Sequence, residues 1–408
     1  MACYYSYLSM SSVFCLPALL FVTFHTTYGV SYTLLGTLVL INFITQFCID
    51  LIFTFFSKYF NVKKTVQFMP FATSAGLFLY ALLPTLFPGH AYLGLALGTV
   101  LFSVSAGLSE VLLSPMIAAM PSENPDRDMS LLHSLYAWGL VIMIIISTAF
   151  LRIFGSENWM YLAMFLAVLP IGAGILFGIS PIPDMQLSGE TTKKAAKRQS
   201  SGLVLCVLCI FLGSAAENVM TNWISGFMEN ALSISKDVCD IIGMAVFAAV
   251  LGLVRSLYAK YGKNIVNVLL IGMIGAVICY LTAGLCPSAA VATAACILTG
   301  AFTAMLWPGT LIMMEENLPA MGVAAYALMA AGGDFGAAAA PQLLGVIADK
   351  VAASAWAQEW ALRNGVSPDR IGLKAGMVMA ALFPLLGIIV VSVIKKKFSN
   401  RKTLHQGE

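Results

Sequence analysis

The stretch PIPDMQLSGETTKKAAKRQSSG, residues 181–202, decides the fold, because it is the only long hydrophilic interruption in the first three quarters of the chain. Apolar runs of about twenty residues, the length that crosses the hydrocarbon core of a bilayer, fill most of the sequence on both sides of it. Six runs precede the stretch and six follow it. The sequence therefore predicts an all-α polytopic membrane protein with two six-helix halves, 1–180 and 203–408, joined by the linker 181–202.

The composition supports a membrane protein. Of 408 residues, 60% are hydrophobic and 10% are charged, whereas soluble domains carry about 25% charged residues. The mean hydropathy is +0.89. The twelve predicted transmembrane spans are 4–25, 33–57, 65–84, 91–117, 129–150, 158–180, 203–226, 238–260, 264–285, 289–314, 322–348 and 372–396.

Lysine and arginine are distributed unequally between the two sides of the predicted membrane. Fifteen of them fall at the ends of even-numbered spans and six on the other side, with Arg255 inside a span. Because loops rich in Lys and Arg remain in the cytoplasm, both termini and the linker are predicted to be cytoplasmic. Compact loops without a targeting signal favour the plasma membrane of a bacterium, its inner membrane. The net charge of +3 gives no indication of nucleic-acid binding.

Weak internal similarity relates the two halves. FFSKYFNVKK after the second span aligns with LYAKYGKNIV after the eighth, which places Lys58 opposite Lys260. The segments around Pro115 and Pro308 align in the same way. Duplicated halves are typical of transporters in which the substrate binds near the midplane and the halves rock around it, giving alternating access.

These features resemble the major facilitator superfamily, and most closely its fucose permease-like sugar:proton symporters. Those proteins have a Glu in span 4, a Pro five residues later, an acidic and basic loop, and a polar span 5 that ends in an aromatic residue and Gly. This chain has Glu110, Pro115, PSENPDRD, and then His133 to Gly139. The loop after span 2 departs from the family pattern, with Lys58 in place of Asp and Asn61 in place of Gly.

The resemblance implies that Glu110 is a proton-coupling residue. The family's acidic partner in span 1 is absent, so coupling in this chain uses another acid or is missing. A buried carboxylate is costly in its charged form, which suits an acid that takes up and releases a proton. A structural hydrogen bond to a neighbouring helix is the alternative. Asp334, in the Gly- and Ala-rich tract AAGGDFGAAAAP, is a second candidate for proton coupling, or it caps a local unwinding of the helix.

Polar side chains in span 7 form the main candidate substrate site. Carboxylate and amide groups orient the hydroxyls of a ligand, and an indole packs on its C–H surface. The alternative is that these groups hold helices together. The candidates are Glu217, Asn218, Thr221, Asn222 and Trp223.

Further substrate contacts are predicted in spans 2, 5 and 10, where polar or aromatic residues occur at membrane depth. Hydrogen-bonded packing is the alternative for His133, and packing beside Pro308 is the alternative for Trp307. These residues are Asn42, Gln46, His133, Tyr136, Trp138 and Trp307.

An inner gate is predicted from three charged residues. Arg255 is expected to reach Asp128 or Glu123, and Asp50 to face Asp334 or the nearby loop. A pair that breaks and re-forms biases a two-state element, and a fixed structural pair is the alternative.

No Walker loop, GxSxG or metal-ligand cluster occurs in the sequence, so we expect neither an enzyme nor a metal or other cofactor. The predicted function is secondary transport of a sugar or related small polar solute by proton symport. The expected partners are the solute, protons and the lipid bilayer, and the expected state is a monomer. Two alternatives are open: an exporter of amphipathic compounds, favoured by 21 Met residues, and a transporter-like sensor or scaffold.

Overall fold

The structure, a computed structural model, is built from helices, as predicted. It describes residues 1–30, 32–183, 193–235, 238–318 and 323–405. Two compact units divide the chain: Met1–Glu190 with Ala320–Ala331, and Thr191–Pro319 with Gly332–Glu408. The middle of the predicted linker, 184–192, lies outside the described residues, so the boundaries 180 and 203 stay predictions.

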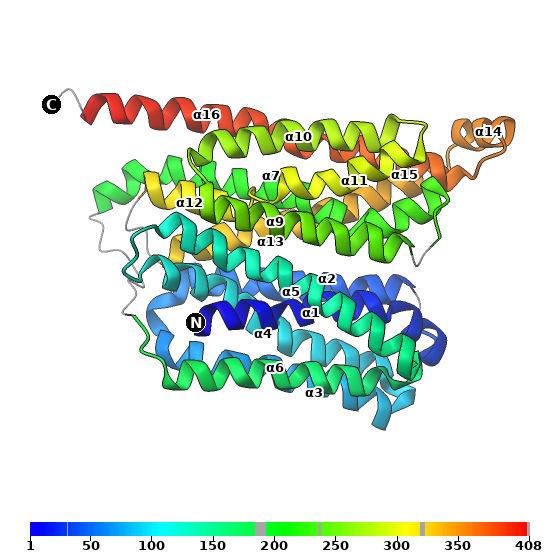
Figure 1. The fold of residues 1–408 in the computed structure, drawn as a ribbon, viewed down its shortest axis with the longest axis horizontal. Coiled ribbons are helices and arrows are strands. Elements are labelled where there is room, and N and C mark those ends of the chain that lie inside the picture. Colours follow the sequence, from blue (N-terminus) through cyan, green and yellow to red (C-terminus); the bar gives the residue numbers. More distant parts are fainter. Residues whose placement is uncertain (31, 184–192, 236–237, 319–322, 406–408) are drawn as a thin grey trace. The chain divides into compact units, whose positions relative to one another are not determined.

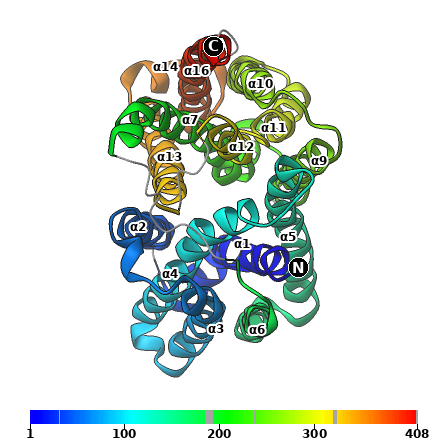
Figure 2. The ribbon, with the colours of Figure 1, turned by 90° about the vertical axis from the view of Figure 1, so that its left-hand side faces the viewer.

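The first unit is a bundle of long helices that run side by side (Figures 1 and 2). Short 3-10 turns η1 (Ser57–Tyr59), η2 (Pro88–His90) and η3 (Ser156–Asn158) join some of them. The long helices are α1 (Ala2–Tyr28), α2 (Tyr32–Phe56), α3 (Val62–Leu86), α4 (Ala91–Ala118), α5 (Pro125–Phe154) and α6 (Trp159–Ile179).

The second unit is also helical, and several of its predicted spans are interrupted. The span 238–260 begins with a π-helical segment, and the spans 289–314 and 372–396 are each divided into two helices. The elements are α7 (Lys193–Leu232), η4 (Cys239–Ala245), α9 (Val246–Tyr261), α10 (Ile265–Leu285), α11 (Ala289–Thr303), α12 (Pro308–Asn317), α13 (Val323–Ala352), α14 (Ala355–Asn364), α15 (Pro368–Ala380) and α16 (Leu382–His405). The residues of α13 up to Ala331 belong to the first unit, and the rest of the helix belongs to the second.

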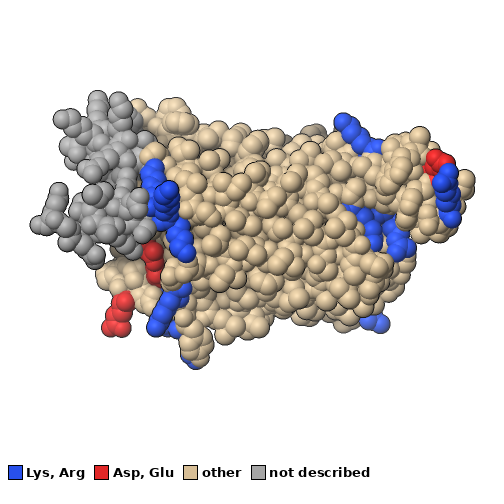
Figure 3. Space-filling model, turned by 90° about the horizontal axis from the view of Figure 1, so that it is seen from above, with Lys and Arg blue, Asp and Glu red and all other residues tan. Residues whose placement is uncertain are grey.

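Each predicted span coincides with one helix or with two consecutive helices. Within the described residues, ten helical segments are long and apolar enough to cross a membrane, and α1 and α13 occupy the other two predicted spans. In Figure 3, lysine and arginine gather toward the two ends of the helices, and the visible belt between the ends bears no charged side chain. A belt of this kind suits the hydrocarbon core of a bilayer.

Local sequence explains where several helices begin. The side chain of Asn61 accepts a hydrogen bond from the Lys64 N–H at the start of α3. Asn124 caps α5 in the same way through the Arg127 N–H, and Pro125 follows as the first helical residue. A side-chain oxygen at this position satisfies an N–H that the helix leaves unpaired, and proline is tolerated because its missing N–H is not needed there.

Glycines bring α3 and α4 close together. A Cβ atom at Gly98 of α4 would lie 2.7 Å from the backbone nitrogen of Tyr80 in α3. Small residues at such crossings let helix backbones approach, and this packing replaces the hydrophobic effect as a source of helix association in lipid.

We therefore expect Gly98→Ala to lower the free energy of unfolding by about 1–3 kcal/mol, the usual cost of overpacking. Gly226→Ala in α7 is the matched control, because a Cβ atom there meets no atom within 4 Å. It should be neutral or stabilising by about 0.5–1 kcal/mol, the gain of alanine over glycine in a helix. The melting temperature of each purified variant in one detergent measures both effects, and equal losses for the two variants would contradict the prediction.

Candidate functional site

The buried face of α2 carries three polar residues at four-residue spacing. Asn42, Gln46 and Asp50 are 9%, 0% and 0% exposed, respectively. Gln46 Nε2 donates to Asn42 Oδ1 over 3.1 Å. The i, i+4 spacing that selected Asn42 and Gln46 in the sequence therefore does place them on one inward face, where the amide groups bond to each other.

The facing surface of α4 is marked by Ser103, Gly107, Glu110 and Ser114, whose 4-3-4 spacing puts them on one side of a helix. Ser103 Oγ donates to Asn42 Oδ1 over 2.6 Å. A Cβ atom at Gly107 would lie 3.1 Å from the Cα of Gln46. Glu110 follows one turn later, and its buried Oε2 has no hydrogen-bond partner among the described residues.

His133 continues this polar face onto α5. Its Nε2 lies 3.4 Å from the Ser114 hydroxyl, and its ring meets Tyr7 of α1 edge to face at 5.2 Å. His133 is buried. Four predicted residues therefore lie along one connected polar surface. Asn42 and Gln46 contribute to it from α2, Glu110 from α4 and His133 from α5.

Tyr136 and Trp138 lie further along α5. The Tyr136 ring packs edge to face against Phe14 of α1, with centroids 5.5 Å apart, and its backbone carbonyl accepts from Ser11 Oγ over 3.0 Å. Trp138 is half-buried. These contacts place Tyr136 at the α1–α5 packing surface, and a substrate role for either aromatic residue stays a prediction.

A buried ion pair joins α7 and α9 in the second unit. Arg255 Nη2 lies 3.0 Å from both Oε1 and Oε2 of Glu217, and the side chains are 2% and 13% exposed. Arg255 Nε donates over 2.7 Å to the backbone carbonyl of Ala304. The guanidinium group therefore bonds to a carboxylate and a backbone oxygen at the same time.

Pro308 explains why the Ala304 carbonyl needs a donor. In a continuous helix the N–H of residue 308 would donate to the carbonyl of residue 304, but proline has no N–H. The chain leaves the helical path between α11 and α12 at this point, and Arg255 fills the open position. Thr310 Oγ1 similarly donates to the Leu306 carbonyl over 2.6 Å.

The other polar residues of α7 bond mostly to their own helix. Asn218 Nδ2 donates to the Ser214 carbonyl, Thr221 Oγ1 to that of Glu217, and Asn222 Nδ2 to that of Asn218. Asn222 is exposed. Their roles in substrate binding stay predictions.

The two tryptophans predicted to contact substrate in the second unit, Trp223 and Trp307, each meet α13. Trp223 Nε1 donates to the Pro341 carbonyl over 3.0 Å. A Cβ atom at Gly333 would lie 2.3 Å from Trp307, so the glycine makes room for that indole. This contact supports packing for Trp307, and a role in lining a cavity remains a prediction.

Asp334 is 2% exposed and lies in an unbroken helix, because α13 runs from Val323 to Ala352. The predicted local unwinding of AAGGDFGAAAAP is therefore wrong. The tract instead allows a close helix approach, since a Cβ atom at Gly336 would lie 2.3 Å from the Phe211 carbonyl oxygen. The glycines of this tract accommodate neighbouring helices without interrupting their own.

The predicted gate residues are placed as follows. Asp128 is in the first turn of α5, where its Oδ2 accepts from Ser122 Oγ over 2.6 Å. Arg255 has Glu217 as an ionic partner, a pairing that was not predicted. The gate contacts of Arg255 with Asp128 or Glu123, and of Asp50 with Asp334, would join residues of different units and stay predictions.

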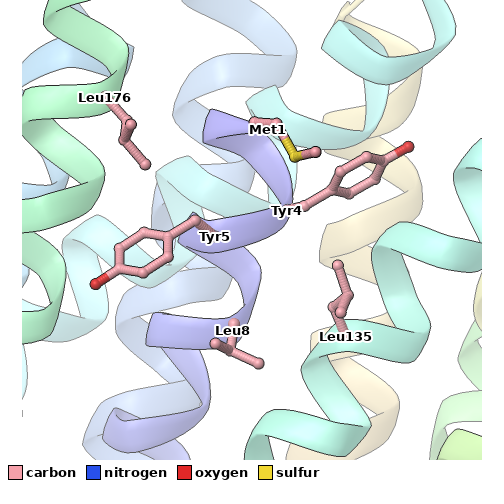
Figure 4. A pocket seen from close by; sticks show the side chains of 6 residues that line it. All are labelled: Met1, Tyr4, Tyr5, Leu8, Leu135 and Leu176. Atoms are coloured by element: carbon pink, nitrogen blue, oxygen red, sulfur yellow. The ribbon is translucent and has the colours of Figure 1, made fainter.

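An apolar cavity of about 300 Å³ lies between α1, α5 and α6 (Figure 4). Its lining includes Tyr4, Tyr5 and Leu135, and its walls offer few polar groups to a hydrophilic solute. In the described part of the chain no three His, Cys, Asp or Glu side chains are grouped as a metal would need.

Sequence reasoning missed three contributors to these clusters: Ser103, Ser114 and the Ala304 carbonyl. The serines recur at helical spacing with Glu110, which is a usable signal. Pro308 indicates that the carbonyl of Ala304, four residues earlier, lacks its usual helical N–H donor. Glu217 and Arg255 are opposite charges in consecutive spans, which is the signal that they pair.

A sequence model described as "Major Facilitator Superfamily" matches residues 3–341. The chain belongs to the major facilitator superfamily. Members of this superfamily are carriers of small molecules embedded in membranes by many helices, so this protein is a multi-pass membrane protein of that fold. No protein of curated function matches the sequence.

Solved structures of the superfamily are similar over nearly the whole chain. The transporter FucP in its outward conformation is 13% identical, with a TM-score of 0.72 and 96% and 97% of the two chains covered; another structure describes FucP as the E. coli fucose:proton symporter. The proton:xylose symporter XylE is 14% identical, with a TM-score of 0.72 and 95% and 94% covered. The human organic anion transporter MFSD10 is 12% identical, with a TM-score of 0.71 and 96% and 98% covered. At this identity the likeness shows the fold.

Proposed function

We propose that this superfamily member moves a sugar or related small polar solute across the membrane by alternating access, in symport with a proton. The observation that carries the proposal is the buried Glu110 Oε2, which has no hydrogen-bond partner among the described residues. A carboxylate that served only to bond a neighbouring helix would have a donor for this oxygen, because an unsatisfied buried acceptor costs about 1–3 kcal/mol. A bound proton offsets that cost.

The second unit supports a polar solute. Glu217 accepts two hydrogen bonds from Arg255 and remains 13% exposed. An ionised carboxylate has lone pairs beyond these two bonds, so it can also accept from solute hydroxyl groups. Two solved structures of similar fold are those of a fucose:proton symporter and a proton:xylose symporter, which agrees with a sugar.

An anionic solute is the second candidate, and the buried Arg255 guanidinium favours it. A solute carboxylate could take the place of Glu217 on Arg255, since Arg binds either carboxylate in the same planar geometry. One solved structure of similar fold is that of a human organic anion transporter.

The proposal includes the cellular arrangement. The protein is a monomer in the plasma membrane of a bacterium, with both termini in the cytoplasm, as the distribution of Lys and Arg supports.

Ligand-induced thermal stabilisation tests the proposal. Sugars and small organic acids are added to purified wild type and Glu217→Gln at pH 5.5 and 7.5, and the melting temperature is recorded. We expect a sugar to raise the wild-type melting temperature, more so at pH 5.5, and to lose this effect in Glu217→Gln. At about 100 times its Kd a ligand stabilises by about 2.7 kcal/mol.

Glu229→Gln is the matched control, because this carboxylate lies on the same helix, three turns beyond Glu217. It should keep the stabilisation by sugar. Stabilisation by organic acids alone would move the assignment to the anionic solute, and stabilisation by no polar solute would contradict the proposal.

A further inference from the structure

Asp50, predicted from the sequence as a gate residue, lies on the buried polar face of α2, the helix that packs against the Glu110 helix α4. It is fully buried on α2, one turn after Gln46. Three polar residues form this face of α2: Asn42, Gln46 and Asp50. Asp50 is the one nearest in depth to Glu110 of α4.

Two independent contacts define the register of α2 against α4. Ser103 bonds Asn42, and Gly107 meets Gln46, so each residue of α4 lies opposite the residue of α2 that is 61 positions earlier in the chain. The two helices run parallel, since the residue numbers of both partners increase from the first contact to the second. Glu110 is therefore level with residue 49, and Asp50 is about 1.5 Å further along the axis.

The polar atoms of this face include acceptors without a donor. Gln46 is fully buried, its Nε2 is used by Asn42, and its Oε1 has no partner among the described residues. Glu110 Oε2 is likewise buried without a hydrogen-bond partner among the described residues. A face that combines two carboxyl groups with an unpaired amide oxygen needs a hydrogen, and a carboxylic acid proton supplies one.

His133 is the titratable group of α5 nearest this level, one turn beyond Glu110 beside Ser114, and its imidazole can carry a positive charge. The other titratable groups that approach α4 are Cys3 and Tyr7 of α1, and Tyr80 of α3 meets Gly98, about three turns before Glu110. The described Lys and Arg residues of the packed elements lie in the terminal turns, as Lys63 and Lys64 do at the start of α3. Two carboxylates close together in a medium of low dielectric are not both ionised.

We propose that Asp50 and Glu110 form a single proton site, in which one proton is held between the two carboxyl groups beside the Gln46 amide. Binding one proton to one carboxylate oxygen changes the charge of the pair from −2 to −1, and release restores it. The use of this site for coupling rests on the proposed function. The proton site itself is independent of any solute.

Infrared difference spectroscopy of the full-length protein in lipid nanodiscs tests the proposal. The C=O band of protonated carboxyl groups is followed as the pH is raised. Asp50→Asn should move the pH at which the Glu110 band is half lost downward by about one unit, a tenfold loss of proton affinity, because the neighbouring negative charge that favours the proton is gone. Glu110→Gln should lower the midpoint of Asp50 in the same way.

The controls separate a shared proton from a structural role. Asp50→Glu keeps a carboxyl group and should keep a midpoint near that of wild type. Thr54→Val removes a hydroxyl one turn along α2, which bonds the Asp50 backbone carbonyl, and leaves both acids in place, so its midpoint should not move. If Asp50→Asn does not fold, Glu110→Gln reports the same coupling.

An unchanged midpoint in both Asp50→Asn and Glu110→Gln would overturn the proposal. Loss of the wild-type band when sodium chloride replaces choline chloride would also overturn it, because the carboxylates would then bind Na⁺ in place of the proton. Solute accumulation distinguishes the two proposals. Proton-driven uptake with an unchanged midpoint leaves the proposed function intact and removes the shared site. A shifted midpoint in a protein that transports nothing leaves the site intact and removes the function.

Discussion

Replacing Arg255 with methionine while Glu217 stays is expected to lower the free energy of unfolding by about 3–5 kcal/mol, the usual cost of removing one partner of a buried ion pair. The cost arises because Glu217, only 13% exposed, would keep its charge without a counterion. The Ala304 carbonyl would also lose the donor that Pro308 cannot supply.

The double variant Arg255→Met with Glu217→Met should recover most of this loss. Replacing both partners of a buried pair by apolar side chains of similar volume is often neutral or stabilising, since no charge remains to be desolvated. The melting temperatures of wild type, both single variants and the double variant form a cycle that isolates the pairwise interaction. A double variant as unstable as Arg255→Met would show that packing and not charge is responsible.

Arg363→Met supplies the matched control within the same unit. Arg363 pairs with Glu359 at i, i+4 on α14, but these side chains are 73% and 64% exposed. Exposed pairs of this kind contribute about 0.3–0.5 kcal/mol. The melting temperature of Arg363→Met should therefore stay close to that of wild type.

Glu110→Gln is expected to abolish accumulation of solute driven by a proton gradient while solute exchange continues. Glutamine has nearly the size of glutamate but cannot take up and release a proton, so the solute moves only to equal concentrations. For one proton per solute, a pH difference of one unit supports about tenfold accumulation, because it is worth 1.36 kcal/mol. In wild type, accumulation should rise as the outer pH falls.

Proteoliposomes with an imposed pH gradient measure this effect, using whichever solute stabilises the purified protein. Counterflow of labelled solute, without a gradient, measures exchange in the same preparation. Glu157→Gln is the control, because this carboxylate is exposed in the short turn η3 between α5 and α6, and it should accumulate solute as wild type does. A Glu110→Gln protein that still concentrates solute would refute the coupling role of Glu110.

Much of the fold was predictable because membrane helices are specified locally. An apolar run of about twenty residues must satisfy its own backbone hydrogen bonds in lipid, and a helix does so within the segment. The twelve runs therefore identified the helices without any knowledge of their neighbours. Local periodicity also placed Asn42 and Gln46 on one face of α2, where they bond to each other.

Interruptions of helices were less predictable. Pro308 marks the break between α11 and α12, and its missing N–H is a property of the residue itself. The glycine tract around Asp334 was read as a local unwinding, but α13 is continuous there. Glycine permits either outcome, and the contacts of Gly333 with Trp307 and of Gly336 with Phe211 show what the small residues accommodate.

The sequence by itself determined the class of protein, the twelve apolar spans and which faces of several helices are polar, because hydrophobicity and periodicity are properties of short segments. Tertiary structure alone decided that Arg255 bonds Glu217 and the Ala304 carbonyl, and that Ser103 and Gly107 set α4 against Asn42 and Gln46. The reason is that a long side chain can reach several partners, and the choice among them depends on the depth and rotation at which two helices pack, which neither helix encodes alone.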